Sequence, residues 1–246
     1  MTIQELDEEE ISIYDIIKEY LNKKAFTPNL DLINFINQRL KSNPDFNRNK
    51  IELIMRSLIR KKIILPGTKL KQEDVLESPL RRKIYRHINR NPGINMSEII
   101  SDLNIGNNQT AWHLENLEKF EFIKSEKIGN QKAFFNFCLD PVFLGVFFYL
   151  RKNKFNDIIN LLKKKNAKSG LTPTAISKKL KIHYNTIRKY LNILVDLQLI
   201  KIIKKKNKKK YILNSENYQE KLDDIKSNTK QVRRTIVEEF LVDIYA

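Results

Sequence analysis

The sequence predicts a mainly α-helical protein with small β-hairpins, an α+β fold class. Glycine and proline are scarce, at 6 and 7 of 246 residues, which argues against a β-rich fold with many tight turns. Hydrophobic residues make up 41% and charged residues 30%, a balance typical of a globular chain rather than a disordered one. The third observation is an internal repeat, which predicts where the helices and hairpins lie.

The repeat appears when the chain is shifted by 77 positions against itself, which aligns two long segments without a gap. The matched pairs include glycine, asparagine and apolar positions: Gly93 with Gly170, Leu103 with Leu180, Asn108 with Asn185, Leu117 with Leu194, and Ile123 with Ile200. A single offset that keeps apolar, capping and turn positions together indicates a duplicated fold.

The first copy is expected to contain three helices followed by a β-hairpin. Its first helix begins at Ser78-Pro79, an N-cap followed by proline at the first helical position. Ser97 is expected to cap the second helix, and the third is expected from about Asn108 to Phe120. Two extended runs, 122–126 and 133–137, flank a turn at Gly129-Asn130 and predict a hairpin. Three helices followed by a hairpin is the order of a winged helix-turn-helix domain.

The second copy repeats this order, so the sequence predicts tandem winged helix-turn-helix domains. Its helices are expected at about 155–165, from Thr172 onward and at 185–197, with a wing of 200–204 and 209–213. The domains are expected as follows: 76–138 is winged helix 1, 139–153 a connecting helix, 154–214 winged helix 2 with a lysine-rich wing, and 215–246 a C-terminal helix.

Residues 1–75 are expected to form a helical N-terminal domain, interpreted as a degenerate winged helix. Ile51, Met55, Leu58, Ile63 and Ile64 reproduce the third-helix and first-strand pattern at an offset of 59 from the first copy. Its second helix is expected at 30–40, and Pro66-Gly67 would be the turn of its wing.

The positive charge of the chain is concentrated toward its C-terminal end. The formal net charge is +17, and residues 151–246 carry 24 Lys/Arg against 9 Asp/Glu. The first 150 residues are close to neutral. A concentrated basic region favours a polyanion such as nucleic acid as the partner.

The third-helix strings carry a family resemblance. Gln109-Thr110-Ala111-Trp112-His113-Leu114 and Asn185-Thr186-Ile187-Arg188-Lys189-Tyr190-Leu191 resemble the third helix of archaeal winged-helix transcriptional regulators of the ArsR/MarR-like superfamily. The resemblance covers residues 76–214. It implies DNA binding with the third helix in the major groove and the wing beside it. The chain departs from the metal-sensing branch, because it has one cysteine and three separated histidines.

Winged helix 2 holds the main candidate DNA-binding residues. Ile187, Leu191 and Leu194 are expected in the core. Arginine and asparagine contact base edges, whereas lysine and threonine hold phosphates, and such residues occupy the outward positions of the third helix. A solvated helix face is the alternative. The candidates on the helix are Asn185, Thr186, Arg188, Lys189 and Asn192, and those in the wing are Lys204, Lys205, Lys206, Lys208, Lys209 and Lys210.

Winged helix 1 holds further candidate DNA-binding residues. Asn108, Gln109 and Trp112 would contact DNA from the third helix, and Lys127 and Lys132 from the wing. Trp112 is equally compatible with an interface to a neighbouring domain. Glutamates at 115, 118, 121 and 126 would be repelled by phosphate. Winged helix 1 is therefore also a candidate for binding a protein partner.

The sequence contains no motif for catalysis, a cofactor or a metal. It has no P-loop, no dinucleotide-binding glycine pattern and no HExxH, so we expect a protein that is not an enzyme. The single cysteine, Cys138, is compatible with a reducing cytoplasm, and DNA binding would place the protein at the nucleoid. The apolar run 142–150 is too short to span a membrane, and with 232–245 it would either support a homodimer or pack the winged helices together.

Three hypotheses follow. The first is a sequence-specific regulator that binds double-stranded DNA. The second is a low-specificity chromatin protein, which needs phosphate contacts and little base recognition. The third is a winged-helix interaction subunit of a transcription or sorting complex, favoured by the near-neutral first 150 residues and opposed by the lysine-rich wing.

Overall fold

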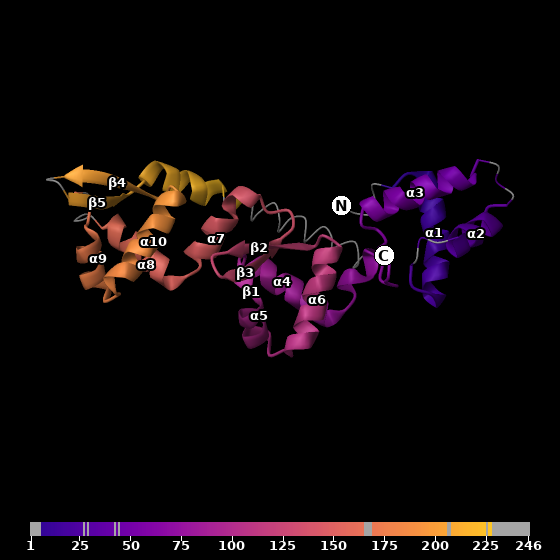
Figure 1. The fold of residues 1–246 in the computed structure, drawn as a ribbon, viewed down its shortest axis with the longest axis horizontal. Coiled ribbons are helices and arrows are strands. Elements are labelled where there is room, and N and C mark those ends of the chain that lie inside the picture. Colours follow the sequence, from indigo (N-terminus) through magenta and orange to yellow (C-terminus); the bar gives the residue numbers. More distant parts are fainter. Residues whose placement is uncertain are drawn as a thin grey trace. The chain divides into compact units, whose positions relative to one another are not determined.

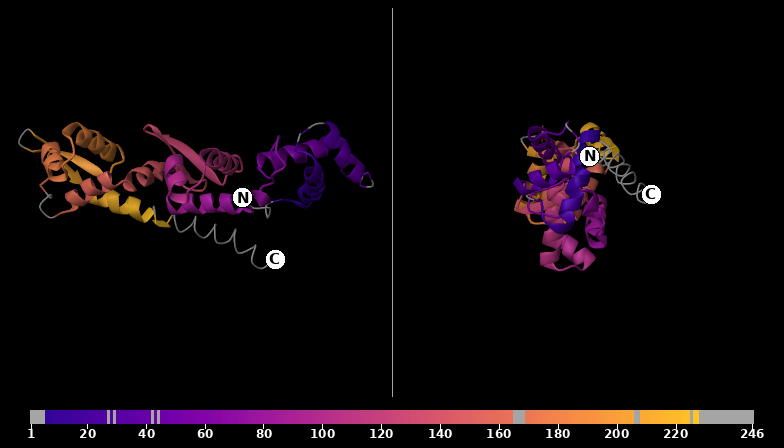
Figure 2. Two further views of the ribbon diagram at one scale, coloured as in Figure 1. Left: turned by 90° about the horizontal axis from the view of Figure 1, so that it is seen from below. Right: turned by 90° about the vertical axis from the view of Figure 1, so that its right-hand side faces the viewer.

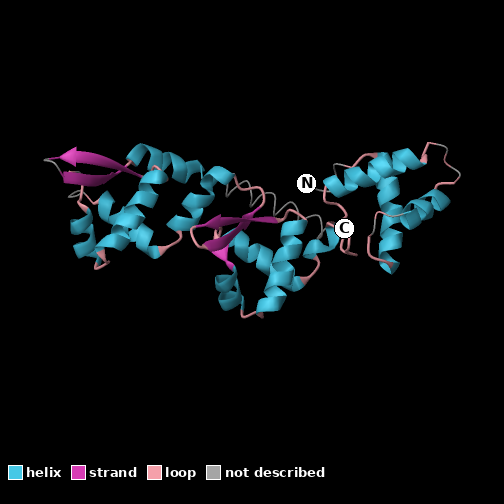
Figure 3. Cartoon of the chain, in the orientation of Figure 1, coloured by secondary structure: helices cyan, strands magenta, loops and turns pink. Residues whose placement is uncertain are grey.

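The computed structural model describes residues 6–26, 28, 30–41, 43, 45–164, 169–205, 208–224, 226 and 227. The fold is mainly helical with two small antiparallel sheets (Figure 3), which confirms the predicted α+β class. The chain divides into two compact units, Met1–Arg86 with Ile105–Ile123, and His87–Asn104 with Lys124–Ala246. Figure 1 labels the helices and strands.

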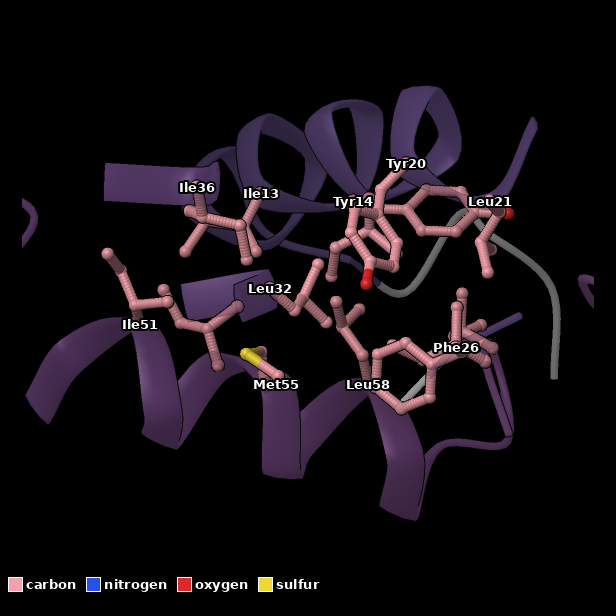
Figure 4. Packing of buried hydrophobic residues seen from close by; sticks show 14 of the residues in the cluster. Ile13, Tyr14, Tyr20, Leu21, Phe26, Leu32, Ile36, Ile51, Met55 and Leu58 are labelled. Carbon is pink, nitrogen blue, oxygen red and sulfur yellow. The ribbon is translucent and has the colours of Figure 1, made fainter. Parts of the chain in front are cut away.

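Three helices form the N-terminal part of the first unit: α1 (Glu8–Lys23), α2 (Leu30–Arg39) and α3 (Arg48–Arg60). The side chain of Asp7 caps α1, and that of Asn47 caps α3. The apolar faces of the three helices meet around Ile13, Leu32 and Leu58, whose side chains are fully buried (Figure 4). The second helix lies where the sequence predicts it.

The wing predicted after α3 is present only in a reduced form. Pro66 and Gly67 lie in a turn, as predicted, but the flanking backbone pairs through one isolated antiparallel bridge between Ile64 and Lys71. The turn is instead bonded to Phe26, whose amide donates to the Thr68 carbonyl and whose carbonyl accepts from the Gly67 amide. Backbone groups used in this way are not available to a hairpin. The degenerate winged helix therefore stays a prediction.

A buried carboxylate joins α1 to α3. The Glu10 side chain is 5% exposed and forms an ion pair with Lys61 Nζ at 2.7 Å. Its oxygens also accept from Ser57 Oγ at 2.6 Å and from the Asp7 amide at 3.2 Å. Burial alone raises the pKa of Glu10, but hydrogen bonds from Lys61, Ser57 and the Asp7 backbone outweigh it, so the pKa is lowered from 4.5.

We expect Glu10→Gln to lower the free energy of unfolding at pH 7 by about 1–3 kcal/mol, because it removes charge-assisted bonds in a buried place. A lowered folded pKa means that ionised Glu10 stabilises the protein above pH 4.5, and that this contribution is lost as the pH falls through the folded value. Urea denaturation at pH 7 and in acid should therefore show the difference shrinking in acid. Glu9→Gln is the control, because the Glu9–Lys50 pair is half exposed and should contribute less than about 1 kcal/mol. Equal losses for the two variants would contradict this account.

Winged helix 1 has the three helices and the hairpin predicted for it, and also a short strand between the first two helices that was not predicted. A short 3-10 helix, η2 (Glu73–Leu76), precedes the elements α4 (Pro79–Arg90), β1 (Ile94–Asn95), α5 (Met96–Leu103), α6 (Asn107–Lys119), β2 (Ile123–Ile128) and β3 (Gln131–Asn136). Strand β3 lies between β1 and β2, and Ile94 pairs with Phe134. Gly129 and Asn130 form the predicted turn.

The predicted cap of the second helix is wrong. Asn95, not Ser97, is the N-cap of α5: its side chain accepts from the Glu98 amide, and the Glu98 carboxylate accepts from the Asn95 amide. Asn95 has the extended backbone that a cap requires because it ends β1, whereas Ser97 already lies inside the helix.

This correction has a direct test. Asn95→Ala should lower the free energy of unfolding by about 1 kcal/mol, as expected for loss of an N-cap. Ser97→Ala should change it by less than about 0.5 kcal/mol, the usual range for a surface position. Thermal denaturation followed by circular dichroism measures both variants, and a larger loss for Ser97→Ala would restore the original prediction.

The connecting segment packs winged helix 2 against the hairpin of winged helix 1 within the second unit. It consists of η3 (Pro141–Phe143) and α7 (Leu144–Leu150). Leu144 and Phe148 join a cluster with Ala133 and Phe135, whereas Val146 joins the core of winged helix 2. The sequence left two roles open for this run, support of a homodimer and packing of the winged helices together. The structure shows the packing role. Burial is not complete around the run, since Val142 is 72% exposed.

Winged helix 2 comprises α8 (Asn153–Lys163), α9 (Pro173–Leu180), α10 (Tyr184–Asp196), β4 (Ile200–Lys205) and β5 (Lys208–Leu213). The left view of Figure 2 shows it, in salmon to orange, from a second direction. The first strand of the domain is reduced to an isolated bridge between Leu171 and Tyr211, at the positions equivalent to Ile94 and Phe134.

The backbone confirms the duplication independently of side-chain identity. Asn104 and Lys181, 77 positions apart, both end the second helix in the left-handed region, with φ of 52° and 54°. Glu121 and Gln198 do the same after the third helix, with φ of 60° and 58°. This conformation is unfavourable for residues other than glycine, so its recurrence at equivalent positions indicates one shared fold.

Helical residues follow winged helix 2 from 215 to 224, and the Tyr218 hydroxyl accepts from Lys163 Nζ at 3.1 Å. The apolar stretch predicted at 232–245 lies outside the described residues. Within the part of the chain that is described, no helix is both long and apolar enough to cross a membrane.

Candidate nucleic-acid interface

Helix α10 presents a polar face because its apolar residues are used in the core. Ile187, Leu191 and Leu194 are fully buried, as predicted from helical spacing. The remaining candidates lie on the other side of the helix: Asn185, Arg188, Lys189 and Asn192 are exposed, and Thr186 is half-buried.

The start of α10 adds one residue that the sequence interpretation missed. Tyr184, the first residue of the helix, is 41% exposed, and the Arg188 guanidinium lies 5.9 Å from its ring centroid. His183 precedes it as the N-cap, and its ring accepts from the Asn185 amide at 3.3 Å. The predicted third helix began at residue 185, so Tyr184 lay just outside it and was not considered. Its place next to Asn185, at the N-terminal end of the third helix, was the signal available.

The wing of winged helix 2 places lysines opposite one another. In the antiparallel register Lys204 pairs with Lys209, Lys205 with Lys208, and Ile203 with Lys210. Lys204, Lys208 and Lys209 are exposed, and Lys210 is half-buried. Lys206 lies outside the described residues.

Helix α9 of the same domain adds exposed lysines. Lys178 and Lys179 in its last turn are exposed, as is Lys181, which ends it. Sequence reasoning did not include them. Three lysines within four positions before the third helix were the signal that would have identified them, since the helix before the recognition helix crosses the DNA backbone in helix-turn-helix proteins.

Winged helix 1 has a different surface. Asn108, Gln109 and Trp112 on α6 are exposed, and Trp112 is 54% exposed. On the same helix Glu115 pairs with Lys119 at 2.7 Å, and the hydrogen bond from Lys119 lowers the pKa of Glu115. The side chain therefore remains an anion.

The ring of Trp112 lies against a buried cation. The Arg81 guanidinium is 5.2 Å from the Trp112 ring, and Arg81 Nη1 donates to the Val75 carbonyl at 2.6 Å. Neighbouring His113 is buried, and burial together with the charge of Arg81 lowers its pKa. His113 is therefore neutral at physiological pH, which supports a packing role for it.

The wing of winged helix 1 borders a polar groove. Lys127 and Lys132 are exposed, as DNA contact requires, and Lys132 Nζ lies 5.2 Å from the Phe134 ring. A groove of about 520 Å³ lies between α5 and the β2–β3 turn, and Ser101, Asp102, Gln131 and Lys132 are among its lining residues. Glu98 also lines it and pairs with Arg151 at 2.8 Å. In winged helix 2, 77 positions later, the residues equivalent to Ser101, Asp102, Gln131 and Lys132 are Lys178, Lys179, Lys208 and Lys209.

Comparison with known proteins supports the helix-turn-helix assignment. Residues 78–142 match the family HTH_HVO_0163_N, an N-terminal HTH domain. This range runs from the start of winged helix 1 to the connecting segment. The chain is also 32% identical, over 145 residues, to an uncharacterized HTH-type transcriptional regulator, MJ1398, of Methanocaldococcus jannaschii. The alignment covers 59% of this chain and 36% of the length of that relative. Neither comparison assigns the ArsR/MarR-like superfamily, which stays a prediction.

Proposed function

We propose that this chain is a transcriptional regulator, not an enzyme, that binds double-stranded DNA through winged helix 2. Helix α10 would lie in the major groove, and the β4–β5 hairpin would follow the phosphate backbone. The HTH domain match and the name of the relative, an HTH-type transcriptional regulator, support a role of this general class. A reducing cytoplasm, at the nucleoid, is the location that fits it.

The observation that carries the proposal is the lysine register of the wing. Lys204 and Lys209 are cross-strand partners, and like charges directly opposite one another destabilise a hairpin. A bound polyanion removes this repulsion, and lysine contacts to phosphate release counterions into solution. The exposed lysines of α9 lie in the same domain and would extend the phosphate contacts.

The outward face of α10 supplies groups suited to base recognition. Arg188 can bind guanine through two hydrogen bonds, and Asn185 or Asn192 can bind adenine in the same way. Lys189 and Thr186 are suited to phosphate. Because these groups share one face of a helix fixed by its buried side, they can contact neighbouring base pairs together.

The test is a titration of labelled duplex DNA followed by fluorescence anisotropy at several salt concentrations, with random and genomic sequences. Tight binding with a steep dependence on salt, about 0.9 in log–log slope per neutralised phosphate, is expected. A preference among sequences supports a regulator, and equal affinity for all supports a chromatin protein. Absence of binding at low salt would refute the proposal.

Winged helix 1 is the candidate for a protein contact, because α6 combines exposed Trp112 with Glu115. Trp112→Ala should then leave DNA affinity within about twofold of the parent. If Trp112 instead stacks on DNA bases, its loss would weaken binding by about 1–3 kcal/mol. The same anisotropy titration, with circular dichroism as the check on folding, distinguishes the two roles.

A further inference from the structure

Helix α3 of the N-terminal domain is equivalent to the third helices of both winged helices. α3, α6 and α10 each have 13 residues. Their starting residues, Arg48, Asn107 and Tyr184, are separated by the offsets 59 and 77 found in the sequence. The residue two positions beyond each helix is left-handed, with φ of 57° at Lys62, 60° at Glu121 and 58° at Gln198.

The hydrogen bonds that end the three helices are also the same. The amide that follows the left-handed residue donates to the carbonyl five residues before it: Ile63 to Leu58, Phe122 to Leu117, and Leu199 to Leu194. Positions on α3 can therefore be compared directly with those on α10.

This comparison identifies an exposed stripe along α3. Asn49, Leu53, Arg56 and Arg60 are all exposed, and their spacing places them on one face of the helix. The equivalent stripe on α10 is Asn185, Lys189, Asn192 and Asp196. The asparagine is shared, and the first three positions on α10 are those proposed above to contact DNA.

The basic residues on and next to α3 differ in whether they form ion pairs. Arg48 pairs with Glu52, Lys50 with Glu9, and Lys61 with Glu10. Arg56 and Arg60 form no ion pair within the described part of the chain. On α6 the equivalent residues are Glu115 and Lys119, which pair with each other. α3 thus presents two guanidinium groups one turn apart, unlike α6.

We propose that α3 is a second DNA-contacting helix, separate from winged helix 2. Arg56 and Arg60 would contact phosphates or guanine edges, Asn49 an adenine edge, and Leu53, which is 64% exposed, a thymine methyl group. The proposal rests on the proposed function, since it assumes that the partner is duplex DNA. A protein partner would need acidic groups opposite both arginines. Helix α6 of a second copy of the chain does not offer a free one at Glu115, because Glu115 is already paired with Lys119.

The test compares two double variants of the full-length chain. Arg56→Gln with Arg60→Gln should weaken binding to duplex DNA at least about fivefold at moderate salt and reduce the log–log salt slope by roughly 1–2. Glu115→Gln with Lys119→Gln changes the equivalent positions of α6 and should leave the slope unchanged. All four residues lie on the surface, so thermal denaturation should be close to that of the parent.

The outcomes separate this proposal from the general function. If the parent chain binds no DNA, the proposed function fails and this proposal fails with it. If the parent binds but the arginine variant keeps its affinity and slope, winged helix 2 binds DNA alone and α3 does not. A molar mass by light scattering that falls from dimer to monomer in that variant, with DNA affinity unchanged, would show that the stripe joins two copies of the chain.

Discussion

Replacing the six wing lysines, 204–206 and 208–210, by glutamine is expected to lower affinity for duplex DNA at least about 100-fold near physiological salt. Each lost phosphate contact removes about 0.9 from the log–log salt slope, so six lysines correspond to a loss of up to about 5. Anisotropy titrations of parent and variant across a range of salt concentrations give both quantities. Loss of slope distinguishes lost phosphate contacts from a general loss of folded protein.

The same substitutions should stabilise the free protein slightly. Because Lys204 lies opposite Lys209 in the hairpin, removing their charge relieves a repulsion worth a few tenths of a kcal/mol. Thermal denaturation without DNA, at low salt, should therefore show an equal or higher midpoint. Weaker DNA binding together with a higher midpoint is difficult to explain by misfolding.

Winged helix 1 offers a matched control for this experiment. Lys127 and Lys132 occupy the positions equivalent to Lys204 and Lys209, and both are exposed. If winged helix 2 carries the binding, Lys204→Gln with Lys209→Gln should weaken it, and Lys127→Gln with Lys132→Gln should not. Equal effects would show that both wings contact DNA, and no effect of either would exclude the proposed role of the wing.

The third helices were predictable because two independent features fix them. The predicted limits of 108–120 compare with the observed Asn107–Lys119, a difference of one residue at each end. Apolar residues at helical spacing determine the buried face, and the extended run that follows each helix limits where it can end. The cap of α5 was less predictable, because Asn95 and Ser97 are both good caps and only β1 decides between them. The reduced form of the wing in the N-terminal domain was not predictable, because the turn is hydrogen-bonded to Phe26, a residue distant in sequence.

In the candidate site, too, features set by helical spacing were predictable from the sequence, and features set by contacts between distant residues were not. The exposure of Arg188 and Lys189 follows from the burial of Ile187 and Leu191, which helical spacing predicts. The stripe on α3 was missed because the net charge was averaged over the first 150 residues. That average includes glutamates of α1 that neutralise Lys50 and Lys61 and leave Arg56 and Arg60 exposed. Only the ion pairs show which charges remain at the surface.

Gly93→Ala and Gly170→Ala are expected to be the most destabilising single substitutions considered. Both glycines have positive φ, 86° and 78°, at equivalent positions of the two copies. A Cβ at Gly93 would lie 3.0 Å from the Phe148 Cα, and one at Gly170 would lie 2.9 Å from the Lys210 Cβ. Strain of about 1–2 kcal/mol from the left-handed backbone adds to about 1–3 kcal/mol from overpacking.

Gly67→Ala separates these two causes. Gly67 has a φ of 80°, but a Cβ there would meet nothing within 4 Å, so only the backbone strain applies. Urea denaturation should therefore show a loss of about 1–2 kcal/mol for Gly67→Ala and about 2–5 kcal/mol for each of the other two. Gly93→Ala should also loosen the contact of winged helix 1 with α7, because Phe148 must move. Equal losses at all three sites would mean that backbone strain alone requires these glycines and that close packing contributes nothing.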